Sequence, residues 1–364
     1  MPAKPRSHVQ RLTPYIPGKP VTEVQRELCL EHVVKLASNE NPLGPSPAAI
    51  AAIHEGASSA HIYPDAASFE LRAALARKHQ ISPDLIMVGS GSDELIHYLS
   101  LIFLDPGDEI IMGDPGFSRY SAGADLAQAK TVLVPLDENE RHDLPAMAAA
   151  ITDNTKLIWI ANPNNPTGTI IRRREFEEFL DHLPDTVAVV LDEAYFEFAI
   201  DPEYPNALDY IRQGRQVIGL RTFSKTYGLA GLRVGYGFAS GEIVKVVDGA
   251  REPFNVTSIA QKAAVAALAD EDHLQRTIRA NQAGLARLTG IFESCGVKTV
   301  ESFTNFVWAD LGRSANQVCS ELLGKGIIIR SGALFGRPTC VRVSIGSPAE
   351  IDAFQAAFRD TVRA

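Results

Sequence analysis

A lysine, two hydroxyl side chains and an arginine lie close together in the sequence, at Lys225, Thr222, Ser224 and Arg233. A lysine taken alone is most often a solvated surface residue. Here, however, the two hydroxyls and the guanidinium could surround a phosphate group while the lysine amine forms an imine with an aldehyde. The spacing therefore indicates a site for a ligand that carries both groups.

More polar residues occur just after apolar segments. Asp192 ends the apolar segment 187–191, and a carboxylate in that place is either a cap or the partner of a buried cation. Asn165 lies in a proline-rich turn, and Tyr195 follows Asp192 by three residues, so both side chains could hydrogen-bond a ligand. Phe117 could stack on a ring, although a lone aromatic residue more often belongs to the core.

A glycine-rich segment at residues 89–94 reads Gly-Ser-Gly-Ser-Asp-Glu. If it opens a helix, the free backbone N–H groups of Ser92 and Asp93 form an anion site. The segment could also be a tight turn or part of a dinucleotide site. A full dinucleotide fingerprint is absent because acidic residues replace its third glycine, which counts against an NAD-dependent enzyme.

Short apolar segments precede these residues and must position them. We expect buried strands at residues 85–88, 109–112, 131–134, 157–160, 187–191 and 217–220, separated by helical patterns such as 93–103 and 173–182. Strands that are apolar on both faces and alternate with helices are typical of a mostly parallel sheet. Ligands of such sheets bind at the carboxyl ends of the strands, so the polar motifs should converge on one crevice.

The pattern changes after about residue 255, where a long helical pattern covers residues 259–292. Strand candidates follow at 306–309, 327–330 and 340–345, and a last helix begins at Pro348. The sequence predicts an α/β protein whose large domain has a mostly parallel sheet covered by helices on both faces, with a smaller α+β domain. We place an N-terminal arm and the start of the small domain at residues 1–44, the large domain at 45–255 and the small domain at 256–364.

The composition excludes several classes of protein. The chain has 364 residues, of which 45% are hydrophobic and 22% charged, as in ordinary globular proteins. A net charge of −9 argues against general affinity for nucleic acid or anionic membranes. The four cysteines show no metal-ligand or redox spacing, and the first residues lack the apolar core of a secretory signal. We expect a cytoplasmic protein without a metal site.

Taken together, the motifs resemble fold-type I aminotransferases that use pyridoxal 5′-phosphate, and most closely the histidinol-phosphate aminotransferase family. The resemblance covers nearly the whole chain, and the order and spacing of its motifs make it specific. They are found at residues 12–15, 17–20, 36–42, 63–65, 91–94, 164–168, 192–195, 224–225, 231–235 and 341–346.

The resemblance implies cofactor roles position by position. Lys225 would hold the cofactor as a Schiff base and shuttle the proton, and Asp192 would pair with the pyridine nitrogen. Asn165 and Tyr195 would bind the phenolic oxygen, and Phe117 would stack on the ring. The residues that would bind the cofactor phosphate are Ser92, Asp93, Thr222, Ser224 and Arg233, with Tyr63 of a second subunit in a homodimer with shared active sites.

The resemblance also implies the substrates. Arg342 would bind the α-carboxylate, Arg330 and Tyr15 the substrate phosphate, and Asn39 is a further substrate-binding candidate. Glutamate or histidinol phosphate would then be the amino donor, and 2-oxoglutarate would be a keto acceptor, as in histidine biosynthesis. An aromatic amino acid aminotransferase shares nearly all of these motifs and stays open. A phosphothreonine decarboxylase and a non-catalytic cofactor-binding regulator are more distant alternatives.

Overall fold

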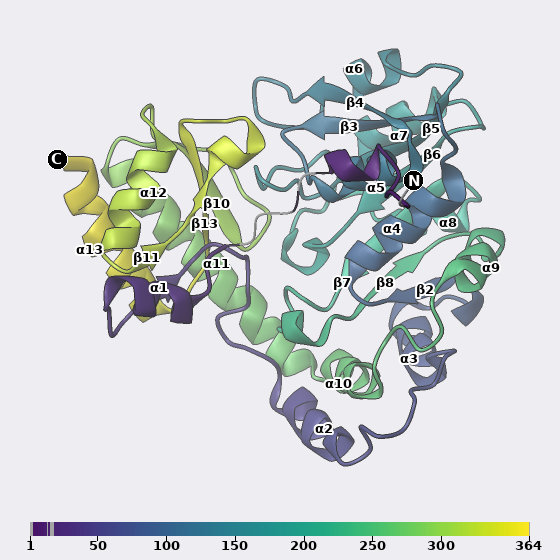
Figure 1. Ribbon diagram of the computed structural model, residues 1–364, viewed down its shortest axis with the longest axis horizontal. Coiled ribbons are helices and arrows are strands. Elements are labelled where there is room, and N and C mark those ends of the chain that lie inside the picture. The colour runs from purple at the N-terminus through teal and green to yellow at the C-terminus, as the bar shows by residue number, and fades with distance from the viewer. Residues whose placement is uncertain (1–2, 13, 15–17, 364) are drawn as a thin grey trace.

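Two sheets organise the chain, and each is the centre of its own layer of helices (Figure 1). The computed structural model describes residues 3–12, 14 and 18–363. The larger sheet has seven strands and the smaller has four, and a separate pair of strands joins the N-terminal segment to the smaller body. The α/β fold class and the smaller α+β region are therefore confirmed.

The large sheet has the order β2-β8-β7-β6-β5-β3-β4. Its strands are β2 (Ile86–Gly89), β3 (Glu109–Asp114), β4 (Lys130–Pro135), β5 (Thr155–Ala161), β6 (Ala188–Asp192), β7 (Val217–Thr222) and β8 (Gly235–Phe238). Neighbouring strands are parallel except where β8 pairs with β2 and β7. The sheet is thus mostly parallel, as predicted.

Helices cover both faces of this sheet because its strands are apolar on both sides. In β6, Ala188 and Val190 face one core, whereas Val189 and Leu191 face the other. The first core includes α4 (Ser92–Phe103), α5 (Arg119–Ala127) and α9 (Gly241–Ala250). The second includes α2 (Pro47–Ala57), α3 (Phe69–His79), α6 (Leu144–Ala149), α7 (Arg173–Asp181), α8 (Ala207–Arg212) and α10 (Ser258–Ala269).

The small body has an antiparallel sheet of order β12-β13-β10-β9. Its elements are β9 (Lys298–Thr299), β10 (Phe306–Asp310), β12 (Arg330–Ser331), β13 (Cys340–Ser344), α12 (Ala315–Gly324) and α13 (Pro348–Arg363). The N-terminal segment adds α1 (Val21–Leu28) and β1 (Val34–Lys35), which pairs with β11 (Ile327–Ile328). Leu36 then packs into the small core, so the beginning of the chain is fixed to its last third.

One long helix, α11 (Glu271–Ser294), connects the two bodies (Figure 1). Leu274 near its start belongs to the core of the large sheet, whereas Leu288 and Phe292 near its end belong to the core of the small sheet. A helix of this length is about 36 Å long, which lets it span both cores. The described residues contain no helix that is both long enough and apolar enough to cross a membrane.

Three of the differences between the structure and the sequence prediction have a clear physical reason. The predicted helix 259–292 is interrupted at Asp270, whose carboxylate caps α11 by accepting a hydrogen bond from the backbone N–H of His273. The predicted strand 327–330 is two short strands, β11 and β12, that belong to different sheets. Strand β8 was not predicted because its sequence, Gly-Tyr-Gly-Phe, has little of the apolar pattern of a buried strand.

The domain limits stay a prediction, although the large core continues to Leu274, beyond residue 256. Short 3-10 helices complete the chain at η1 (Val9–Arg11), η2 (Pro83–Leu85), η3 (Phe196–Phe198), η4 (Ala230–Leu232) and η5 (Gly332–Phe335). Tyr15, in the predicted arm, lies outside the described residues.

Candidate active site

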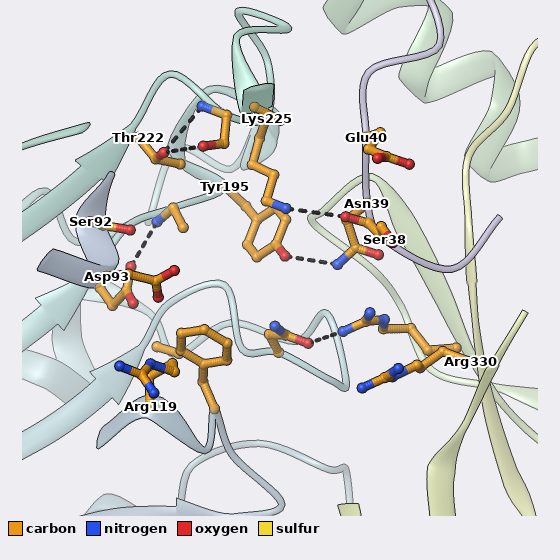
Figure 2. Close-up of a pocket in the computed structure, with 18 of the residues that line it drawn as sticks. Ser38, Asn39, Glu40, Ser92, Asp93, Arg119, Tyr195, Thr222, Lys225 and Arg330 are labelled. Carbon is orange, nitrogen blue, oxygen red and sulfur yellow. Dashed lines mark hydrogen bonds between the residues drawn. The ribbon is translucent and has the colours of Figure 1, made fainter. Parts of the chain in front are cut away.

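The loops that follow strands β2, β5, β6 and β7 meet at one edge of the large sheet, where they face the small body (Figure 2). They enclose a cavity of about 380 Å³. The predicted site residues that line it are Asn39, Ser92, Asp93, Phe117, Asn165, Asp192, Tyr195, Thr222, Ser224, Lys225, Arg233, Arg330 and Arg342. The predicted convergence of distant motifs on one crevice is therefore confirmed.

Among the described residues, one predicted site residue, Tyr63, does not line this cavity. Tyr63 is 80% exposed, and its ring stacks on that of Phe254 with 4.8 Å between the centroids. Tyr15 lies outside the described residues. A tyrosine that serves the site of a second subunit is expected to be exposed in a single chain, so the position of Tyr63 does not conflict with its predicted role.

The amine of Lys225 lies in the middle of the cavity, directed toward the segment that carries Ser38 and Asn39 (Figure 2). Its Nζ donates to the Ser38 carbonyl oxygen at 3.4 Å and lies 5.7 Å from the centroid of the Tyr195 ring. Burial, followed by the positive charge of Arg342, lowers the pKa of Lys225 to about 8. A substantial fraction of this amine is therefore neutral near pH 8, as a nucleophile or base requires.

The carboxylate of Asp192 lies at the end of β6, on the floor of the cavity. Its Oδ2 accepts a 2.7 Å hydrogen bond from the Tyr120 hydroxyl, and its Oδ1 accepts one from the Ala194 backbone N–H at 3.2 Å. Burial raises the pKa of Asp192 to about 6, and these two hydrogen bonds oppose the rise. The group is therefore mainly anionic at neutral pH.

An anion-binding corner is formed where α4 begins. Ser92 is the first residue of this helix, so its backbone N–H has no partner within the helix. The Thr222 hydroxyl donates to Ser224 Oγ at 2.9 Å, and Arg233 Nη1 lies 3.5 Å from the same oxygen. Backbone N–H groups, hydroxyls and a guanidinium in one corner suit a phosphate.

Glycine is required at Gly91 in this corner. Its φ is +80°, and a Cβ atom there would lie 2.5 Å from Nη2 of Arg233. The guanidinium of Arg233 also approaches Asp93, with 3.6 Å between Nη2 and the carboxylate. A larger side chain at residue 91 would therefore displace the arginine from the corner.

The opposite side of the cavity is formed by Asn39, Arg330 and Arg342. Asn39 Nδ2 donates to the Tyr195 hydroxyl at 2.8 Å, and Asn39 Oδ1 accepts from Ser344 Oγ at 2.8 Å. Arg330 and Arg342 are cross-strand partners on β12 and β13, so their side chains lie on the same face of the small sheet. This side therefore presents two mostly buried guanidinium groups to the cavity.

Arg342 also connects the two sides. Its Nη2 donates to the Ala37 carbonyl oxygen at 3.0 Å, and its Nη1 donates to Oδ1 of Asn165 in the loop after β5. We call the residues Asp192, Ser92, Thr222, Ser224, Lys225 and Arg233 the large-sheet wall, and Asn39, Arg330 and Arg342 the small-sheet wall.

Several residues of the cavity were missed by the sequence analysis. Tyr120 was overlooked because a tyrosine on the apolar face of a helix has the pattern of a core residue. Ser38 contributes its backbone carbonyl, which no side-chain pattern can indicate. Lys35 and Glu40 also line the cavity and form an ion pair with 3.0 Å between Nζ and the carboxylate. Ser38 and Glu40 lie within the motif at residues 36–42, but the resemblance assigned neither of them a role.

Known proteins share both the sequence and the fold. The family model for aminotransferase class I and II matches residues 31–358. A histidinol-phosphate aminotransferase of Moorella thermoacetica is 47% identical over 98% of this chain and 92% of its own length. One of Caldicellulosiruptor saccharolyticus is 44% identical over 94% of this chain and 95% of its own length.

Solved structures agree with these relatives. The crystal structure of a histidinol-phosphate aminotransferase from Sinorhizobium meliloti in complex with pyridoxal 5′-phosphate has a TM-score of 0.92 and 30% identity, covering 100% of this chain and 98% of that one. The match of the family model and these long, similar relatives lead to one conclusion. The chain belongs to the class I and II aminotransferases.

Proposed function

We propose that the chain is a pyridoxal-5′-phosphate-dependent aminotransferase that exchanges an amino group between histidinol phosphate and 2-oxoglutarate, as in histidine biosynthesis. The observation that carries the proposal is the presence in one cavity of a lysine whose pKa is lowered to about 8 and a buried carboxylate. The name shared by the relatives of M. thermoacetica and C. saccharolyticus supports the choice of substrate.

The donors of the cavity fit the cofactor. Lys225 would bind its aldehyde carbon, and the buried anion of Asp192 would pair with its protonated ring nitrogen. Tyr195 and Asn165 would bind the phenolic oxygen, and Phe117 would pack on the ring. The phosphate would be held in the anion-binding corner by Ser92, Asp93, Thr222, Ser224 and Arg233.

Each wall has its own task in this proposal. When bound, the cofactor supplies a sink for the electrons released as the substrate Cα–H bond breaks. The amino group of the substrate would take the place of Lys225 on the aldehyde carbon, and the released amine of Lys225, in its neutral form, would then remove the Cα proton. Arg342 binds the α-carboxylate of glutamate, and Arg330 binds the distal phosphate or carboxylate, because a planar guanidinium accepts either anion.

We also propose that the active unit is a homodimer. Tyr63 is exposed together with Ile62 and Phe69, which form an apolar region close to one another in the sequence. In a dimer, Tyr63 of each chain would reach the phosphate corner of the other. The cysteines among the described residues are free thiols, which suits a reducing cytoplasm.

The test is a spectral titration of the purified, cofactor-loaded chain with histidinol phosphate, glutamate and phenylalanine, each added separately. We expect histidinol phosphate to change the absorption band of the bound cofactor at far lower concentration than phenylalanine does. The opposite order would make the chain an aromatic aminotransferase, and a chain that binds no pyridoxal phosphate would contradict the proposal altogether.

A matched variant sharpens the choice of substrate. Arg330→Gln should weaken the response to histidinol phosphate by about 10²-fold, because a charge-assisted contact to a phosphate is lost, and should change the response to phenylalanine much less. Equal losses for both substrates would show that Arg330 does not recognise the phosphate.

A further inference from the structure

The side chain of Tyr120 lines the cavity, and its hydroxyl donates a 2.7 Å hydrogen bond to the carboxylate of Asp192. We propose that Tyr120 is a positioning residue whose hydroxyl fixes the orientation of Asp192 and keeps it anionic for the ring nitrogen of the cofactor. This inference rests on the proposed function, because it assigns to Asp192 the role proposed above.

The ring of Tyr120 has little freedom to move. It stacks on Trp159 of β5 with 4.6 Å between the ring centroids and an interplanar angle of 11°. The ring of Phe117 also contacts it in an edge-to-face arrangement, with centroids 5.6 Å apart. Because Tyr120 is only 2% exposed and its ring packs against two other aromatic rings, its hydroxyl has a fixed place relative to the end of β6.

Asp192 needs such a donor because its surroundings oppose its charge. Burial is the main cause that raises its pKa, and the negative charges of Asp93 at the start of α4 and Glu193, directly after β6, add to the effect. Tyr120 from α5 and the Ala194 N–H act in the opposite direction. The other ionisable groups lining the same cavity include Tyr195, Lys225 and Arg233.

Tyr120 is suited to be a permanent donor. Burial and the nearby charge of Asp192 raise its own pKa well above the ordinary value for tyrosine, so the hydroxyl keeps its proton at any physiological pH. With the Ala194 N–H, it leaves each oxygen of Asp192 bonded to one protein donor. The carboxylate is therefore held in one plane while its remaining lone pairs can face a ligand.

The first test measures the titration of Asp192 in the full chain without cofactor. Carbon-13 NMR of labelled aspartate carboxyls gives the midpoint, and Asp192→Asn identifies the signal. We expect Tyr120→Phe to raise the midpoint by about one pH unit, a tenfold change in proton affinity. Tyr204→Phe is the matched control, because Tyr204 is also buried but donates to the Asn162 carbonyl oxygen. An unchanged midpoint in Tyr120→Phe would overturn the inference.

A gentler change keeps the test valid if the phenylalanine variant does not fold. Incorporation of 3-fluorotyrosine at residue 120 preserves size and hydroxyl but makes the phenol more acidic and a stronger donor. The titration midpoint of Asp192 should then fall below that of the unmodified chain. A midpoint that stays the same or rises would contradict a hydrogen bond that holds the charge on Asp192.

The second readout links Asp192 to the cofactor. Equilibrium dialysis gives the affinity for pyridoxal 5′-phosphate of the unmodified chain and of Tyr120→Phe at pH 7 and pH 9. The affinity of the unmodified chain divided by that of the variant should be larger at pH 7 than at pH 9, because at pH 7 part of Asp192 is protonated in the variant. The titration of Lys225 changes the affinity of both chains alike, so its effect cancels in this ratio. A ratio independent of pH would overturn the inference. Absence of binding by the unmodified chain would instead contradict the proposed function, which the cofactor-free titration does not depend on.

Discussion

The two walls of the cavity are built in different ways. Residues of the large-sheet wall lie at the ends of strands or within a few positions of them, as Asp192 and Thr222 end β6 and β7. The small-sheet wall depends on contacts across almost the whole chain. Arg342 donates a hydrogen bond to the Ala37 carbonyl oxygen and Ser344 donates one to the Asn39 side chain, and each pair is 305 positions apart in the sequence. Groups proposed for chemistry are thus positioned locally, whereas groups proposed for recognition depend on the closure of the fold.

The walls are nevertheless coupled through charge. After burial, the positive charge of Arg342 is the largest cause of the lowered pKa of Lys225. A substrate carboxylate that neutralises Arg342 would therefore weaken this effect and raise the proton affinity of the amine. Carboxylate binding by the small-sheet wall and proton transfer by the large-sheet wall can be studied separately by substituting one residue in each wall.

Removal of the amine from the large-sheet wall should have the largest effect. Lys225→Ala should lower kcat by at least about 10⁴-fold, because it removes both the group that binds the aldehyde and the base. Steady-state assays measure the rate. Dialysis should still detect cofactor, since the phosphate corner is intact, and circular dichroism should show an unchanged fold.

Lys245→Ala is the control for this change, because Lys245 is an exposed lysine on α9, away from the cavity. It should retain full activity. If Lys225→Ala kept a kcat within tenfold of the unmodified chain, the large-sheet wall would not be the place of the chemistry.

A change on the small-sheet wall should be smaller and of a different kind. Arg342→Gln should lower kcat/KM for glutamate by about 10²–10³-fold, mainly through KM, because truncation of a buried, hydrogen-bonded charge costs about 3–4 kcal/mol. It should also raise the pKa of Lys225 above about 8 in the cofactor-free chain. Mass spectrometry of lysine acetylation at a series of pH values measures this pKa.

Arg313→Gln controls for loss of a small-domain arginine, since Arg313 pairs with Glu321 outside the cavity. It should change neither KM nor the pKa of Lys225. A loss of kcat alone in Arg342→Gln would mean that this arginine acts on chemistry rather than on binding, and the distinction between the walls would be lost.

The difference between the walls also explains what could be predicted from the sequence. Apolar segments followed directly by polar motifs predicted the parallel sheet and the crevice at its carboxyl edge, because that relation is local. The resemblance to a known family predicted which distant residues line the same cavity, including Arg330 and Arg342. Their chemical roles stay predictions until they are measured.

The contacts between side chains could not be predicted in the same way. The Tyr120–Asp192 bond joins a helix to a strand 72 positions away, and nothing in either local sequence indicates it. Strand β8 was missed for a related reason. A Cβ at Gly237 would lie 2.8 Å from the Gly219 carbonyl oxygen, so close packing requires a residue that weakens the strand pattern.

The smallest predicted effect concerns the hydrogen bond between Asn39 of the small-sheet wall and Tyr195, which follows β6. Asn39 Nδ2 donates to the Tyr195 hydroxyl at 2.8 Å, and both residues are almost fully buried. Asn39→Ala should lower kcat/KM by about tenfold, because a buried hydrogen bond contributes about 1 kcal/mol and its unpaired partner adds a penalty. Tyr195→Phe should lower it by at least as much, because the proposed contact of this hydroxyl with the phenolic oxygen is lost as well.

A double-mutant cycle isolates this bond. Asn39 has a φ of 55°, so alanine there adds backbone strain that has nothing to do with Tyr195. That strain is present in Asn39→Ala and in the double variant alike, and it cancels in the coupling free energy. We expect a coupling of about 1 kcal/mol in transition-state binding between Asn39→Ala and Tyr195→Phe, but additive effects between Asn39→Ala and Tyr204→Phe. Additivity in both cycles would mean that Asn39 and Tyr195 act on the substrate independently.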